Sequence, residues 1–242
     1  MTGGRLYLLP TLLGADGTDD LPPRTVTVAR QVRHFLAEDA KSARAFLKAI
    51  GHPDPIAGLS IVEIGHEPPA ERLDDWLAPL AAGHDVAVVA EAGCPAVADP
   101  GAGLVARAHA LGHRVVPLVG PSALLLALMA AGLNGQAFRF VGYLPRDEAT
   151  LRAVLQTLER RSAAESETQL FIETPYRNAR LFDMVLAACA PGVRLAVATD
   201  LTLPDEAIAM RTVAQWRALA PAQRSRLERR PTVFALLAPG RR

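Results

Sequence analysis

The sequence predicts an α/β protein with a largely parallel sheet. Short, nearly continuous apolar runs are typical of strands that helices cover on both faces. Longer stretches with an apolar stripe at helical spacing separate these runs. An alternation of the two patterns is typical of α/β folds. The expected strands cover residues 5–9, 86–90, 115–118, 169–172, 194–198 and 233–237.

The expected helices follow from the spacing of their apolar residues. In residues 40–50, for example, Ala43, Phe46, Leu47 and Ile50 fall on one stripe. The same pattern recurs between the other expected strands. The complete set of expected helices covers residues 40–50, 72–82, 101–111, 123–133, 148–161 and 178–190.

Several helix ends carry recognisable capping residues. Asp99 followed by Pro100 is typical of an N-cap with proline at the first helical position, and Ser122 offers a second N-cap. Gly112 and Gly192 lie where helices give way to strands, as C-terminal glycines do.

A domain boundary is expected near residues 134–146, where Asn134 and Gly135 form a turn signal. The sequence therefore predicts two α/β domains, residues 1–134 and 135–242. The polar stretch 160–168 is expected to be a loop or a frayed helix end.

Composition excludes several classes of protein. The chain has 242 residues, of which 50% are hydrophobic and 21% charged, which excludes intrinsic disorder. A net charge of +1 argues against a protein that relies on non-specific phosphate neutralisation, although a local basic patch stays open. Apart from Lys41 and Lys48, every basic residue other than histidine is arginine. A coding bias explains this excess, and an alternative is bidentate recognition of carboxylate or phosphate.

No pattern for export, membrane insertion or metal binding is found. The two cysteines, Cys94 and Cys189, form no disulfide framework, so a cytoplasmic protein is expected. Residues 1–9 lack a signal pattern, and the longest apolar run, 123–133, is too short for a bilayer. The histidines do not cluster, so no metal is expected. No membrane association is expected either, because the apolar runs are short.

Common nucleotide and hydrolase motifs are also missing. Neither lysine follows a glycine, so there is no phosphate-binding P-loop, and no G-x-G-x-x-G occurs. Gly120 and Ser122 begin a G-x-S-x-G pattern, but Leu124 stands where the final glycine is needed. We therefore interpret Ser122 as a helix cap rather than a nucleophile.

Four loops that follow expected strands are rich in glycine, proline and alanine. Ligands bind at the carboxyl ends of strands in open α/β sheets, and small residues let a ligand approach the backbone. The alternative is that these residues only make tight turns, but their recurrence favours a ligand cleft. The four loops cover residues 10–14, 91–101, 119–123 and 173–178.

These loops, taken in order with further short motifs, resemble the tetrapyrrole methylase superfamily. Within it, they are most similar to the branch of small-subunit ribosomal RNA 2′-O-ribose cytidine methyltransferases. The resemblance implies two α/β domains with S-adenosylmethionine in the cleft between them, usually in a homodimer. The motifs cover residues 10–14, 38–39, 92–95, 99–101, 120–123, 142–145, 173–177 and 201–202.

The resemblance also implies roles for individual residues. Glu38 and Asp39 are candidates for the catalytic base, although they could instead cap the helix that begins at Ala40. Tyr176 and Arg177 would contact substrate, with a structural ion pair as the alternative for Arg177. The cofactor would be bound by Leu13, Gly14, Gly93, Cys94, Val97, Ser122, Ala123, Ile172, Glu173, Asp200, Pro231 and Thr232.

Departures from the branch concern the substrate more than the cofactor. Several cations and a histidine of the RNA-methylating branch are missing here, including the arginine that Lys41 replaces. Ribosomal RNA is the expected partner. The alternatives are another small-molecule or tetrapyrrole-like substrate, or a degenerate cofactor-binding dimer without catalysis. Arg224, Arg226, Arg229 and Arg230 form a candidate RNA-facing patch.

Overall fold

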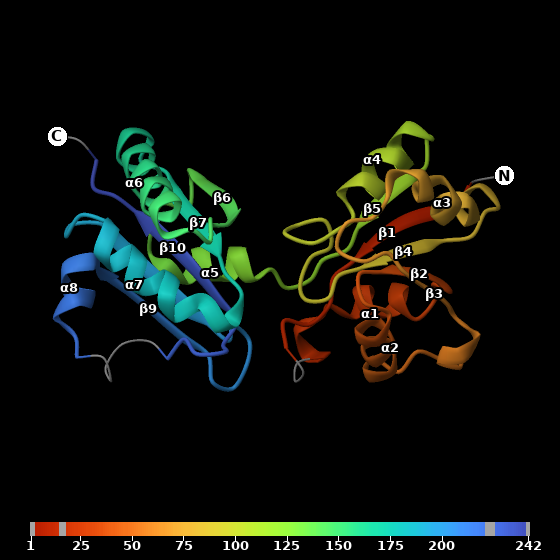
Figure 1. Cartoon of the computed structure of the whole chain (residues 1–242). Coiled ribbons are helices and arrows are strands. Elements are labelled where there is room, and N and C mark those ends of the chain that lie inside the picture. The colour runs from red at the N-terminus through yellow and green to blue at the C-terminus, as the bar shows by residue number, and fades with distance from the viewer. Residues whose placement is uncertain (1–2, 15–17, 221–225, 241–242) are drawn as a thin grey trace. The chain divides into compact units, whose positions relative to one another are not determined.

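The computed structural model describes residues 3–14, 18–220 and 226–240 of the chain. It divides the chain into two compact units, Met1–Ser122 and Ala123–Arg242. Each unit carries its own five-stranded sheet (Figure 1). The division comes earlier than the turn signal at Asn134 suggests, because helix α5, Ala123–Ala131, packs on strands of the second sheet.

The first unit is a fully parallel sheet with strand order β3-β2-β4-β1-β5, which agrees with the expected parallel arrangement. Its strands are β1 Arg5–Leu9, β2 His34–Ala37, β3 Ser60–Glu63, β4 Val86–Val89 and β5 Arg114–Pro117. Its helices are α1 Pro23–Ala29, α2 Ala40–Ala49, α3 Leu73–Ala81 and α4 Ala102–Ala110. Three short 3-10 turns complete it: η1 Thr18–Asp20, η2 Ile56–Gly58 and η3 Ala70–Arg72.

Two apolar clusters cover opposite faces of the first sheet, since alternate residues of a strand point to opposite sides. Phe35 and Ala87 belong to the cluster that includes α2, whereas Leu36 and Val88 belong to the cluster with α3 and α4. Figure 1 shows α1 and α2 on one side of the sheet and α3 and α4 on the other. Burial on both faces explains why the central strands are continuously apolar.

The second unit is a mixed sheet with strand order β6-β7-β10-β8-β9, so the expectation of a largely parallel sheet is wrong here. Only β6 and β7 pair in parallel, while the other neighbours are antiparallel. The connection between β8 and β9 is too short for the crossover that parallel strands need. The strands are β6 Phe138–Tyr143, β7 Thr168–Ile172, β8 Arg194–Thr199, β9 Ala207–Thr212 and β10 Thr232–Leu237.

Helices and one apolar core complete the second unit. The buried rings of Phe171 and Phe234 stack with centroids 5.5 Å apart, and Phe182 meets Trp216 edge to face at 5.3 Å. Besides α5, the helices are α6 Glu148–Glu165, α7 Asn178–Ala188 and α8 Val213–Ala218, with a 3-10 turn η4 Pro175–Arg177.

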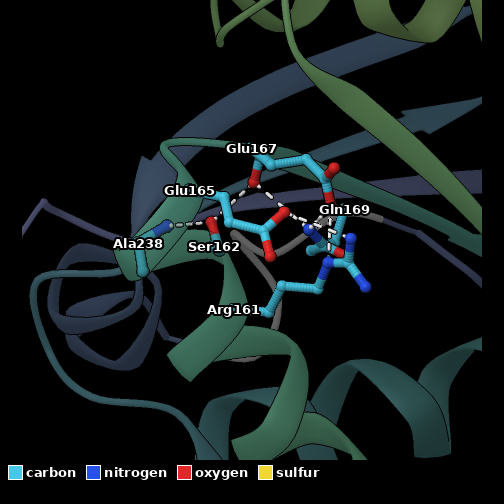
Figure 2. A network of polar contacts seen from close by, with 6 residues as sticks. All are labelled: Arg161, Ser162, Glu165, Glu167, Gln169 and Ala238. Carbon is cyan, nitrogen blue, oxygen red and sulfur yellow. Dashed lines mark hydrogen bonds and ion pairs between the residues drawn. The ribbon is translucent and has the colours of Figure 1, made fainter.

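Helix α6 continues beyond the position where the sequence predicts a loop or frayed end. A polar network, shown in Figure 2, orders this end of the helix. The buried Ser162 hydroxyl donates to the Glu167 carbonyl at 2.8 Å and accepts from the Ala238 N–H at 2.9 Å. Arg161 pairs with Glu167 at 3.0 Å, and the Gln169 amide donates to the same carboxylate at 2.7 Å. These contacts join α6 to β7 and to the segment after β10.

The predicted caps have different outcomes. Gly112 is in the left-handed conformation with φ of 75° and ends α4, as expected. Asp99 is not the N-cap of α4, because the helix begins at Ala102 and Gly101 occupies the cap position with φ of 131°. Gly192 caps no helix, since α7 ends at Ala188. Within the described ranges, no helix combines the length and apolar character needed to cross a membrane.

Candidate functional site

The carboxyl ends of β1, β2, β4 and β5 lie at one edge of the first sheet, because all its strands are parallel. The loops that leave these strands contact one another. The Thr11 N–H donates to the Gly93 carbonyl at 2.9 Å, and the Cys94 thiol donates to the Pro121 carbonyl at 3.4 Å. This edge carries the predicted site residues Leu13, Gly14, Glu38, Asp39, Gly93, Cys94, Val97 and Ser122.

Two glycines let these loops approach closely. Gly93 has φ of 77°, and a Cβ there would lie 3.1 Å from the Leu13 side chain. At Gly120, a Cβ would lie 2.3 Å from the Cβ of Pro10, which is closer than any normal contact. Glycine is therefore required sterically at Gly120 and conformationally at Gly93.

A pocket of about 520 Å³ opens at this edge. Its volume lies within the range of small-molecule sites. One wall is the face of α2, including Phe46, and another is the loop after β1, including the predicted residues Leu13 and Gly14. The complete lining is Thr11, Leu12, Leu13, Gly14, Ser42, Ala45, Phe46, Ala49, Glu91, Ala92 and Asp99.

Two acidic residues at this pocket, Glu91 and Asp99, are missing from the predicted site residues, and Asp99 was expected only to cap a helix. Its Oδ2 atom is buried and has no hydrogen-bond partner among the described residues. Burial, together with the nearby carboxylates of Glu38 and Glu91, raises the pKa of Asp99 to about 7, against an opposing effect of His66. A local Asp-Pro signal cannot reveal this burial.

Glu38 is a buried carboxylate at the end of β2. Its Oε1 atom pairs with Nδ1 of the exposed His66, and its Oε2 atom has no partner in the described part of the chain. Burial raises the pKa of Glu38, and the charges of Glu91 and Asp39 add to this effect, whereas His66 opposes it. His66 was not predicted, because the adjacent residues His66 and Glu67 lack the second histidine that a metal-binding motif would need.

Asp39 is the N-cap of α2. Its Oδ1 atom accepts from the Ser42 N–H at 2.6 Å, and its extended backbone conformation is typical of that position. The hydrogen bonds from Ser42 lower the pKa of Asp39. A lowered pKa makes a carboxylate a weaker base, so the geometry favours the capping role over the catalytic one.

A second set of predicted residues gathers at one edge of the second sheet. The ends of β7 and β8 meet the start of β10 there, because β10 runs antiparallel to both. The Asp200 N–H donates to the Pro231 carbonyl at 3.0 Å. The side chain of Asn178, which was not predicted, donates to the Arg230 carbonyl at 2.7 Å. The predicted residues at this edge are Ile172, Glu173, Asp200, Pro231 and Thr232.

Two ion pairs engage the charged side chains of this edge. Arg177 binds the buried Glu173 carboxylate at 2.5 Å, and Arg230 binds Asp200 at 2.5 Å. The structural ion pair that was the alternative for Arg177 is therefore present. Tyr176, by contrast, is 70% exposed.

The remaining predictions concern single residues. Ala123 is the first residue of α5, directly after Ser122, and Val97 is 47% exposed. Arg224 lies outside the described residues, whereas Arg226 and Arg229 are exposed. No group of three histidine, cysteine, aspartate or glutamate residues in the described ranges is arranged to hold a metal ion.

Comparison with known proteins adds family information to this geometry. The family model described as Tetrapyrrole (Corrin/Porphyrin) Methylases matches residues 6–216. A protein of Pseudomonas aeruginosa named Ribosomal RNA small subunit methyltransferase I is 37% identical over 178 residues, which cover 73% of this chain and 59% of that protein. Its namesake in Xylella fastidiosa is 36% identical over 214 residues, which cover 88% of this chain and 74% of that protein.

Solved structures show the same fold. The crystal structure of the methyltransferase CobJ matches with a TM-score of 0.62 and 20% identity, over 99% of this chain and 100% of that one. Uroporphyrin-III-C-methyltransferase from Thermus thermophilus matches with a TM-score of 0.52 and 19% identity, over 98% of this chain and 93% of that one. At these identities the similarity concerns the fold alone.

Proposed function

The chain belongs to the tetrapyrrole (corrin/porphyrin) methylase family, and from this premise we propose that it methylates a ribose 2′-hydroxyl of small-subunit ribosomal RNA with S-adenosylmethionine. The relatives named for that ribosomal RNA support the substrate. The observation that carries the proposal is the pocket at the carboxyl edge of the first sheet. A ribosomal RNA substrate would place the protein in the cytoplasm.

The pocket fits the chemistry of this cofactor. S-adenosylmethionine carries a sulfonium and an ammonium group, and both are cations that carboxylates stabilise. Asp99 and Glu91 supply carboxylates at the pocket, and Leu12 and Leu13 supply apolar surface. Gly93, in its left-handed conformation, brings bare backbone to the same edge. These features support the cofactor assignment.

We assign the cofactor contacts as proposals, unit by unit. In the first unit, Leu13, Gly14, Gly93, Cys94 and Val97 would contact the methionine and ribose. Ser122 and Ala123 would hold the methionine tail at the start of α5, where backbone N–H groups favour a carboxylate. In the second unit, the adenine contacts would be Ile172, Glu173, Asp200, Pro231 and Thr232. Because ion pairs engage Glu173 and Asp200, backbone groups are the more available partners there.

The protein's part in the reaction is alignment and proton removal. When bound, S-adenosylmethionine supplies the activated methyl group. A ribose hydroxyl is a weak nucleophile, so a base near it accelerates transfer. Glu38 and Asp39 are the catalytic candidates from the sequence; burial favours Glu38, while capping weakens Asp39 as a base. Tyr176 would contact the RNA, and Arg177 would do so only if its pair with Glu173 opens.

The test is transfer of labelled methyl groups to small-subunit RNA from a strain that lacks the corresponding gene. We expect incorporation at one ribose, located by mass spectrometry, and none into RNA from the parent strain. Calorimetry with S-adenosylmethionine provides the second measurement. Binding without transfer to RNA would favour the degenerate cofactor-binding dimer, and absence of binding at millimolar ligand would refute both. Transfer to a tetrapyrrole precursor alone would refute the RNA substrate.

We also propose a homodimer. Support comes from the family resemblance and from exposed apolar side chains on the second unit, where Met129 is 78%, Leu125 50% and Phe138 44% exposed. Light scattering should give the mass of two chains, and Met129→Glu should lower that mass. A monomeric wild-type protein at micromolar concentration would refute this proposal.

A further inference from the structure

Two carboxyl groups near the pocket each have one oxygen without a partner. Asp99 lines the pocket, and its Oδ2 atom is shielded from solvent. The side chain of Glu38 is only 7% exposed, and its Oε2 atom is likewise unpaired in the described residues. A buried polar atom without a partner costs free energy and suggests a ligand or a function.

The titratable groups around Asp99 come from three segments. Glu38 lies at the end of β2, Glu91 and Cys94 in the loop after β4, and His66 after β3. Glu38 and Glu91 are carboxylic acids, and His66 already pairs with Glu38. Because β2 and β4 pair directly, their carboxyl ends bring Glu38 and Glu91 to the same edge of the sheet. Like charges in a place shielded from solvent disfavour one another's ionised form, so such a cluster retains a proton more strongly than an exposed carboxylate does.

We propose that Asp99 and Glu38 form a carboxyl pair that holds a single proton, and that Asp99, once ionised, is the base that accepts the proton of the acceptor hydroxyl. The second half rests on the proposed function. In this pair Glu38 is a positioning residue, because it acts through Asp99. Asp99 is assigned the contact with substrate because it lines the pocket, whereas Glu38 is not among the lining residues.

The proposed methyl transfer is a direct displacement at the methyl carbon. The hydroxyl oxygen forms a bond to the methyl carbon while the bond from that carbon to the sulfonium sulfur breaks. The electron pair of the broken bond stays on sulfur, which becomes a neutral thioether. The hydroxyl proton moves to Asp99 and afterwards leaves to water. No oxidant, reductant or metal is required.

The acid strength of Asp99 suits this role. A base is most effective when its pKa lies near the working pH, and the pKa of Asp99 is raised to about 7. The capping carboxylate of Asp39 has the opposite shift, so it is the poorer base.

The first experiment measures the proton without any turnover. Carbon-13 NMR of labelled aspartate carboxyls follows Asp99, assigned by comparison with Asp99→Asn, in the wild-type protein and in Glu38→Gln. We expect a midpoint near pH 7 in the wild type and a lower midpoint in Glu38→Gln, because a like charge is removed. Asp75→Asn, whose carboxylate on α3 is 74% exposed, is the control and should change nothing. A midpoint for Asp99 at the usual pH of an exposed aspartate, or a midpoint that Glu38→Gln does not change, overturns the proposed pair.

The second experiment measures kcat/KM for S-adenosylmethionine against pH, which reports the ionisation of the free enzyme. We expect the wild-type value to rise through about pH 7 to a plateau. Asp99→Asn should lower the plateau about 10²–10⁴-fold and flatten the profile. Glu38→Gln should move the midpoint to lower pH, because Asp99 then loses a neighbouring carboxylate. Circular dichroism and cofactor calorimetry confirm that each variant is folded and binds.

The opposite kinetic result would assign the base to Glu38. If Glu38→Gln flattens the profile and Asp99→Asn only shifts it, the role given to Asp99 is wrong. If the wild-type protein transfers no methyl group to small-subunit RNA, the proposed function fails and the assignment of Asp99 as its base fails with it. The NMR titration still decides whether the carboxyl pair exists, so the two failures can be told apart.

Discussion

Gly120 lies where the loop after β5 crosses the loop after β1, and its replacement by alanine tests whether these loops are held together. The new Cβ would lie 2.3 Å from Pro10 Cβ and 2.7 Å from Pro10 Cγ. Both Pro10 atoms belong to a rigid ring, so the loops must separate by about 1 Å to restore normal contact. Overpacking of this kind costs about 1–3 kcal/mol of unfolding free energy. For a chain of this length, the melting temperature falls by about 2–4 °C per kcal/mol.

Gly120→Ala should also lower methyl transfer. A displacement of about 1 Å near a reacting centre can cost about 10²-fold in rate, and these loops carry the proposed contacts Leu13 and Gly14. The assays are urea unfolding and methyl transfer at saturating cofactor. Gly58→Ala is the matched control, because a Cβ there meets nothing within 4 Å. If the two variants unfold and turn over alike, the close approach of the loops is not what holds the site.

The remaining predictions use single substitutions. Asp39→Asn should keep the cap of α2 and leave activity within a few-fold, whereas Asp39→Ala should lower the urea midpoint; loss of activity in Asp39→Asn alone would instead make Asp39 the base. Cofactor binding by calorimetry should tighten as pH rises through about 7, because Asp99 then ionises, and Asp99→Asn should remove this dependence. Because folding raises the pKa of Asp99, the protonated carboxyl stabilises the fold at low pH, and this contribution is lost as pH rises through the folded pKa. Asp99→Asn should therefore have a higher melting temperature than the wild type at alkaline pH. The same difference in melting temperature at every pH would refute this. Ser162→Ala should lower the free energy of unfolding by about 1–3 kcal/mol, because the Ala238 N–H loses its acceptor. Thr157→Ala, at an exposed position of the same helix, should lower it much less. Equal urea midpoints for the two variants would contradict the role of the network.

The strands that the sequence predicted best are those buried at the centre of each sheet. β4 and β10, for example, are buried at every position and read as continuous apolar runs. Four strands, β2, β3, β6 and β9, were absent from the expected set. β3, β6 and β9 are partly exposed edge strands, so polar residues interrupt their apolar pattern. β2 lies inside the first sheet and is mostly buried, but it has only four residues and begins with a histidine, so its apolar run is short. Strand direction in the second sheet was also missed. A strand buried on both faces has the same apolar pattern whether its neighbours are parallel or antiparallel, so the pattern alone carries no direction.

The site loops were predictable because glycine and proline have local conformational effects that survive folding. Gly93 and Gly120 illustrate this, since each permits a close approach that a side chain would block. The carboxylates of the pocket were not predictable in the same way. Asp99 precedes a proline and so carries the local signal of a helix cap, but the helix begins later. Its environment depends on the carboxylates of Glu38 and Glu91, and Glu38 lies far from Asp99 along the chain. Only the folded sheet brings these carboxylates together.

The ion pairs of the second unit bear on how RNA would be bound. In the second unit, Arg177 and Arg230 pair with Glu173 and Asp200, so each phosphate contact from these arginines requires an existing pair to open. Such an exchange gains less free energy than a contact made by an unpaired cation, because one ion pair replaces another. Affinity for RNA should therefore depend less steeply on salt than the number of arginines suggests. Specificity would then depend on the shape of the RNA and on its bases, which Tyr176, exposed beside Arg177, is placed to stack against.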